Sequence, residues 1–146
     1  MEILKPTIED FTLAQHDHLD DKGGGLLGID WYDYSELSTI VGWSDFSTKQ
    51  IYVAKLGRTV FVMFYLAGTS DSTGSTFTVP YTVNDLMMMI SVNVRRSDND
   101  GTEAVGLAII NNTTKLCTLY STLAKGAWTA SGHKRIQGQF FYESAV

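Results

Sequence analysis

Residues 59–67 read TVFVMFYLA, and this stretch decides the fold. Valine, phenylalanine and tyrosine favour strands, so the stretch is predicted to be a β-strand. Its apolar side chains run almost without interruption, which indicates a strand that is covered on both faces. In a two-layer β protein one face meets the core. The other face is predicted to be a subunit interface or, as the alternative, to be covered by the chain's own N-terminal arm.

Similar strand-like runs surround this stretch, and turn-rich pieces such as GTSDSTG, SDNDG and NNTT separate them. Since no amphipathic stretch long enough for a crossover helix lies between the runs, the strands are expected to pair antiparallel. The sequence therefore predicts an all-β, antiparallel, jelly-roll-like β-sandwich over residues 36–146, preceded by an extended N-terminal arm over residues 1–35. The further runs are 40–43, 50–56, 75–81, 86–95, 103–111, 115–121 and 136–143.

Composition and charge narrow the class of protein. Hydrophobic residues make up 44% of the 146 residues, enough to bury one core. A net charge of -5 argues against a nucleic-acid partner, and the adjacent basic pairs Arg95-Arg96 and Lys134-Arg135 are interpreted as solvated strand ends. The opening MEILKPTIED has neither a basic region nor a long apolar run, so no signal or membrane segment is expected.

Residue sets for catalysis are sparse. No GxSxG motif is present, and His133 follows a glycine turn as a lone imidazole that is expected at the surface. Cys117 lies in the alternating stretch KLCTLYS and is expected to pack as a small apolar side chain. A pair of acids such as Asp71 and Asp85 could still come together in the fold, as in glycoside hydrolysis. The sequence predicts a protein that is not an enzyme, and a carbohydrate-active enzyme on a β-sandwich stays as the alternative.

The predicted arm carries spaced apolar residues before a run of three glycines. Spaced apolar anchors are typical of a segment that becomes ordered on a partner, and consecutive glycines give the backbone freedom to turn. The predicted partner-docking residues are Ile3, Leu4, Ile8, Phe11 and Leu13, and the predicted hinge is Gly23, Gly24 and Gly25.

His16 and His18 stand two residues apart between the anchors and the glycines. In an extended chain both imidazoles project to the same side, with Cα atoms about 6–7 Å apart. One chain supplies too few nitrogens for a strong site, but three chains around a threefold axis would supply six ligands for one transition metal ion. The alternative is a solvated polar segment without metal.

The stretch FTLAQHDHLDDKGGGLL resembles a segment of many tailed-bacteriophage virion appendage proteins, in which F-T-x-A-x-H-x-H precedes a glycine-rich turn. The stretches KLGRTVFVMFYLAGTSDSTGSTFTVPYT and WTASGHKRIQGQFFYE are similar to the β-sandwich modules that end phage tail fibres and related adhesins. The first match consists of Phe11, Thr12, Ala14, His16, His18 and Gly23 to Gly25.

This resemblance implies a non-enzymatic structural protein of the virion, arranged as a homotrimer. Its N-terminal arm would dock on other virion proteins, and its sandwich would face outward for decoration or for adhesion to the host surface. Because no long shaft or repeat is present, a short appendage, head fibre or decoration protein fits better than a long fibre. For contact with a host glycan the candidates are Tyr81, Tyr120 and Trp128, although aromatic residues in β domains more often belong to the core.

Overall fold

A computed structural model of the chain describes residues 30–84, 92–97, 103–110 and 115–145. These residues form nine strands and contain no helix. The strands are β1 (Tyr32–Asp33), β2 (Ile40–Val41), β3 (Trp43–Leu56), β4 (Thr59–Ser70), β5 (Thr76–Thr78), β6 (Val92–Ser97), β7 (Glu103–Ile110), β8 (Leu116–Tyr120) and β9 (His133–Glu143).

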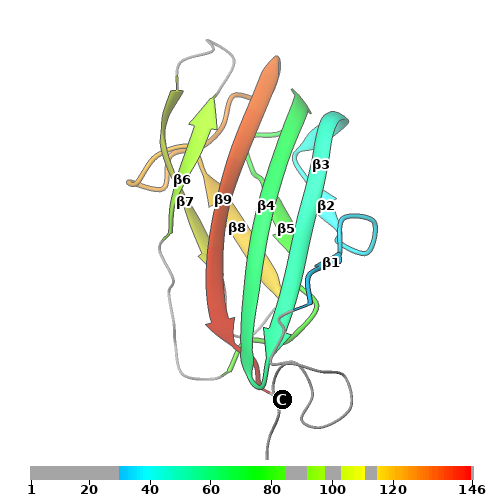
Figure 1. The fold of residues 1–146 in the computed structure, drawn as a ribbon. Coiled ribbons are helices and arrows are strands. Elements are labelled where there is room, and N and C mark those ends of the chain that lie inside the picture. The colour runs from blue at the N-terminus through cyan, green and yellow to red at the C-terminus, as the bar shows by residue number, and fades with distance from the viewer. Residues whose placement is uncertain (1–29, 85–91, 98–102, 111–114, 146) are drawn as a thin grey trace, which may run out of the picture.

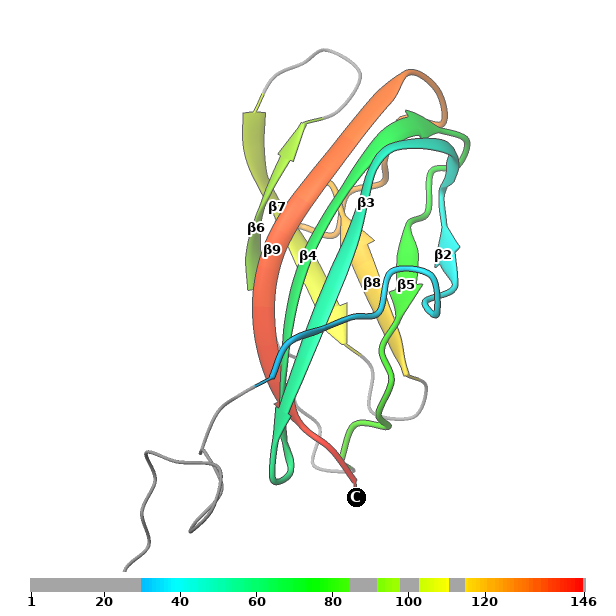
Figure 2. The same cartoon turned by 45° about the vertical axis from the view of Figure 1, so that its right-hand side comes forward.

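The strands hydrogen-bond in the order β1-β3-β4-β9-β6-β7-β8-β5-β2, and every pair is antiparallel. The sheet folds over, so that β1, β3, β4 and β9 form one layer and β7, β8, β5 and β2 lie behind it (Figures 1 and 2). The prediction of an all-β antiparallel fold with two packed layers is confirmed. The sheet already begins at Tyr32, so residues 32–35 at the end of the predicted arm lie at its edge.

Strand β3 is seven residues longer than the predicted run 50–56, since it also includes the polar stretch WSDFSTK. Polar residues suit this part because its pairing with β4 is irregular, with register shifts between Trp43 and Asp45 and between Phe46 and Thr48. Gly68 on β4 makes room for the first irregularity, because a Cβ there would lie 2.0 Å from the carbonyl oxygen of Asp45.

The turn that follows β1 ties the two edges of the folded sheet together through buried serines. The Ser35 hydroxyl accepts a hydrogen bond from the Ile51 amide of β3 at 2.8 Å. The Ser38 hydroxyl donates to the carbonyl oxygen of Thr78 on β5, also at 2.8 Å. One short turn therefore holds β3 in the front layer and β5 in the rear layer, and this closes the open side of the sandwich.

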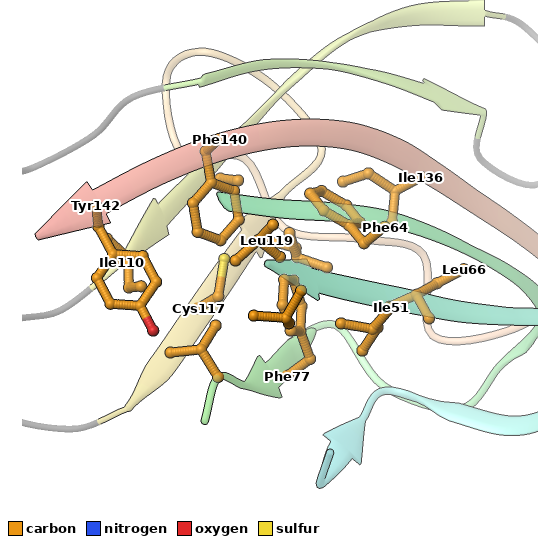
Figure 3. Packing of buried hydrophobic residues seen from close by; sticks show 14 of the residues in the cluster. Ile51, Phe64, Leu66, Phe77, Ile110, Cys117, Leu119, Ile136, Phe140 and Tyr142 are labelled. Carbon is orange, nitrogen blue, oxygen red and sulfur yellow. The ribbon is translucent and has the colours of Figure 1, made fainter. Parts of the chain in front are cut away.

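Apolar side chains from both layers fill the space between them. Phe64 of β4 packs against Phe77 of β5 with ring centroids 5.0 Å apart, and Phe140 of β9 lies beside both (Figure 3). Cys117 of β8 belongs to this cluster and is buried, as predicted. The contact of rings from opposite layers shows that a single core holds the sandwich together.

A lysine is also buried between the layers. Lys134, at the start of β9, has no exposed surface, which corrects the interpretation of Lys134-Arg135 as a solvated strand end. Its ammonium donates hydrogen bonds to the carbonyl oxygen of Gly42 and to the hydroxyl of Ser75, and it lies 4.2 Å from the ring centroid of Trp43. Gly42 has φ +106° and a Cβ there would meet this group, so the position requires glycine.

Candidate assembly surface

Most sites that the sequence singled out lie in the N-terminal part of the chain, outside the described residues. The metal-ligand, docking and hinge predictions therefore stay predictions. The positions concerned are His16, His18, Ile3, Leu4, Ile8, Phe11, Leu13, Gly23, Gly24 and Gly25.

In the described part of the chain, three or more His, Cys, Asp or Glu side chains nowhere gather into a group that could hold a metal ion. His133 is exposed at the start of β9, and Asp71 is exposed beyond β4, whereas Asp85 lies outside the described residues.

Burial raises the pKa of the Cys117 thiol well above its usual range, which disfavours the nucleophilic thiolate. Across residues 30–84, 92–97, 103–110 and 115–145, no helix reaches the length and apolarity that a membrane span needs.

The three aromatic residues predicted to contact a glycan have different surroundings. Trp128 is only 3% exposed, and its indole N–H donates to the carbonyl oxygen of Leu119 at 3.0 Å. This position corrects the prediction for Trp128, since a buried ring offers no face to a sugar. Tyr120 on β8 and Tyr81 after β5 are both half-buried.

Tyr81 belongs to a small polar and aromatic cluster at one end of the sandwich. The ammonium of Lys55 lies 4.2 Å from its ring centroid, and its carbonyl oxygen accepts a hydrogen bond from the buried Tyr142 hydroxyl at 2.9 Å. Burial, together with a hydrogen bond to Tyr81, raises the pKa of the Tyr32 hydroxyl well above its usual range. No sequence pattern connects Tyr32 with Tyr81, because β1 has only two residues and gives no strand signal.

The outer face of the front layer carries the outward side chains of the apolar stretch 59–67. Along β4 the side chains at Val60, Val62, Phe64 and Leu66 point inward and are buried. The alternate residues point to the opposite face, away from the core. The apparently continuous apolar run is therefore a strand with one apolar side in the core and a second apolar side directed outward.

Neighbouring strands extend this outward apolar surface. Phe141 of β9 lies directly opposite Phe61, with ring centroids 6.2 Å apart, and is 57% exposed. Tyr52 of β3 lies opposite Met63, which is 37% exposed, and Leu56 at the end of β3 is 46% exposed. We call this surface the apolar face, and it consists of Tyr52, Leu56, Phe61, Met63, Tyr65 and Phe141.

Charge is nearly absent from the same surface. Within Gln50–Leu56, Thr59–Tyr65 and Gln137–Glu143, each strand contributes four outward positions, and among these positions only Glu143 is charged. Its carboxylate pairs with Arg58 at 3.2 Å. Asp33 stands at the rim, opposite Tyr52, and hydrogen bonds from the Ser35 side chain and amide lower the pKa of its carboxyl.

Glutamine amides occupy three of the six outward positions that remain. Gln50 and Gln137 flank Tyr65 on either side, and Gln139 lies opposite Met63. A surface with an apolar centre, uncharged amides and charges at its rim has the composition of a protein–protein interface.

Searches of known protein families, of curated proteins and of solved structures found no match to this chain.

Proposed function

We propose that this chain is a non-enzymatic structural protein of a phage virion, with the N-terminal arm docked on the particle and the sandwich displayed on the outside as a homotrimer. The single observation that supports this function best is the apolar face, where Phe61, Met63 and Phe141 are directed away from the core. Exposed contiguous apolar surface of this kind is typical of proteins that work in an assembly.

The resemblance of the N-terminal segment and of the β-sandwich to phage appendage proteins supports the virion setting. A jelly-roll-like form of the sandwich and a role in decoration or in adhesion to a host glycan belong to the same proposal. Tyr81 and Tyr120, which are both half-buried, are the candidates for this contact, because Trp128 is buried.

The particle itself provides the test of this function. Mass spectrometry of purified virions from the source of the sequence should detect the chain, and gold-labelled antibodies against the sandwich should mark one place on the particle. Deletion of residues 1–25 should abolish attachment and leave a folded sandwich. A chain that is abundant during infection but missing from purified virions would contradict the proposal.

The histidine pair requires a separate measurement. If His16 and His18 from three chains hold one transition metal ion, elemental analysis of the purified trimer should give up to one metal per three chains. His16→Ala should then remove the metal. A trimer that contains no metal and is unchanged by His16→Ala would leave the histidines as part of a solvated polar segment.

A further inference from the structure

We infer that the apolar face is an interface between copies of this chain, in which the outer surfaces of β3, β4 and β9 from neighbouring copies converge around the threefold axis of the proposed homotrimer. This inference deepens the proposed function and rests on it for its biological setting, because it names the surface through which the copies meet. Figure 1 shows these three strands side by side in the front layer, with β4 in the middle. The centre of the interface would be the pair Phe61 and Phe141.

Its chemistry suits a copy of itself. Two surfaces with aromatic and methionine centres exclude water from each other, and aromatic residues and methionine are enriched in interface cores. The amides of Gln50, Gln137 and Gln139 carry both donors and acceptors, so the same three side chains on two copies can hydrogen-bond to each other. A surface of carboxylates or of ammonium groups would repel its own copy, but this one carries neither at its centre.

The distribution of charge argues against the chain's own N-terminal segment as the occupant of this face. Residues 1–29 contain six Asp and Glu and two Lys, a net charge of 2 - 6 = -4 out of the -5 of the whole chain. Residues 30–146 contain ten acids and nine bases, a net charge of 9 - 10 = -1. Packing the acidic segment onto the face would bring carboxylates to an apolar centre, where no outward position of Gln50–Leu56, Thr59–Tyr65 or Gln137–Glu143 is a cation. A second sandwich brings almost no net charge.

Exposed apolar side chains elsewhere in the described residues do not form such a surface. Leu37, Val41, Val105 and Leu123 are exposed on four separate segments, namely the turn after β1, strand β2, strand β7 and the loop after β8. Trp31 and Tyr32 are exposed at the edge of the front layer, just before and within β1. Single exposed apolar residues are normal on protein surfaces and require no partner. Leu123 is 57% exposed, the same fraction as Phe141, and therefore provides a matched control.

Sedimentation equilibrium of the full chain and of two variants tests the interface. Wild type should be a stable oligomer at micromolar concentration. Phe141→Glu should raise the dissociation constant by about tenfold or more, because it places carboxylates of neighbouring copies together in an apolar contact. Leu123→Glu makes the same change in charge at the same exposure, and should leave the oligomer unchanged. Circular dichroism should show that both variants remain folded.

Cross-linking keeps the inference testable even if Phe141→Glu does not fold. Cys117 is the only cysteine of the chain and is buried, so Met63→Cys introduces an accessible thiol on the face, and Leu123→Cys introduces one away from it. Under mild oxidation Met63→Cys should form a covalent dimer faster than Leu123→Cys. Equal rates, or an oligomer that survives Phe141→Glu, would overturn the inference.

The outcome separates this inference from the proposed function. A folded wild-type monomer at micromolar concentration would overturn the inference and the homotrimer, while the presence of the chain in virions would still support its role as a virion protein. An oligomer that depends on Phe141 in a chain absent from virions would support the interface and contradict the function.

Discussion

Replacement of Ser75 by alanine should destabilise the sandwich more than the loss of an ordinary serine hydrogen bond. Ser75 is only 1% exposed, and its hydroxyl accepts a hydrogen bond from the Lys134 ammonium at 2.7 Å. Lys134 has no exposed surface, so water cannot easily take the place of the missing oxygen. The remaining contacts of the ammonium include the Gly42 carbonyl oxygen and the Trp43 ring, with Trp128 at 5.5 Å.

The expected loss follows from the charge of the donor. A hydrogen bond to a charged group contributes about 1.5–3 kcal/mol, against about 1 kcal/mol for a neutral one. The Gly42 oxygen and the Trp43 ring stay in place in Ser75→Ala, so the loss should be smaller than the 3–5 kcal/mol typical of a buried charge that loses its partner. We therefore expect the free energy of unfolding to fall by about 2 kcal/mol, which corresponds to a Tm lowered by about 8 °C.

Urea denaturation followed by tryptophan fluorescence measures this difference. Ser121→Ala is the matched control, because Ser121 is also buried and its hydroxyl donates to the neutral Ala127 carbonyl oxygen at 2.6 Å. The control should lose only about 1 kcal/mol. Equal losses in the two variants, or a Ser75→Ala protein as stable as wild type, would refute the argument that Ser75 stabilises a buried charge.

Three further predictions concern other buried or crowded groups. Burial is the main cause that raises the pKa of Tyr142, so its hydroxyl should stay protonated in the folded protein at pH values where free tyrosine ionises. Since the unfolded chain releases this proton near pH 10, the contribution of Tyr142 to stability should be complete below that pH and fall above it, as alkaline denaturation curves would show. The Cys117 thiol should not react with Ellman's reagent at pH 8 until the protein is unfolded, and rapid reaction of the native protein would contradict its burial. Gly68→Ala should cost about 2 kcal/mol or more, because its Cβ would overlap the Asp45 carbonyl oxygen and the backbone would have to shift. Thermal unfolding measures this cost, and an unchanged Tm would show that the bulge adjusts freely.

The sequence was sufficient for the class of fold because strand composition and turn residues are local signals. The runs at 59–67, 103–111 and 115–121 correspond closely to β4, β7 and β8. Residues 44–49 of β3 were missed because all of them except Phe46 are polar, and polar residues between apolar runs usually indicate a turn. Strand β1 was missed for a different reason, since a pair of residues at a sheet edge has no periodicity to detect.

The candidate surface was only partly predictable. The apolar run at 59–67 indicated a strand covered on both faces, but Phe141 joins that surface only through the pairing of β4 with β9, which no local pattern reveals. The burial of Lys134 was unpredictable for the same kind of reason. Lysine is rarely buried, and the carbonyl oxygen and the hydroxyl that make its burial possible come from residues about 92 and 59 positions away along the chain.

The outward apolar side chains of the front layer are not explained by the stability of a single sandwich. Val60, Val62 and Phe64 already fill the inward side of β4, and polar residues would serve equally well on the outward side of an antiparallel sheet in water. The outward side chains of Phe61, Met63 and Phe141 instead expose surface whose contact with water is unfavourable. Three neighbouring outward positions are uncharged glutamines. A contact with another protein surface removes this cost, and the near neutrality of the face favours a copy of the same chain as that surface.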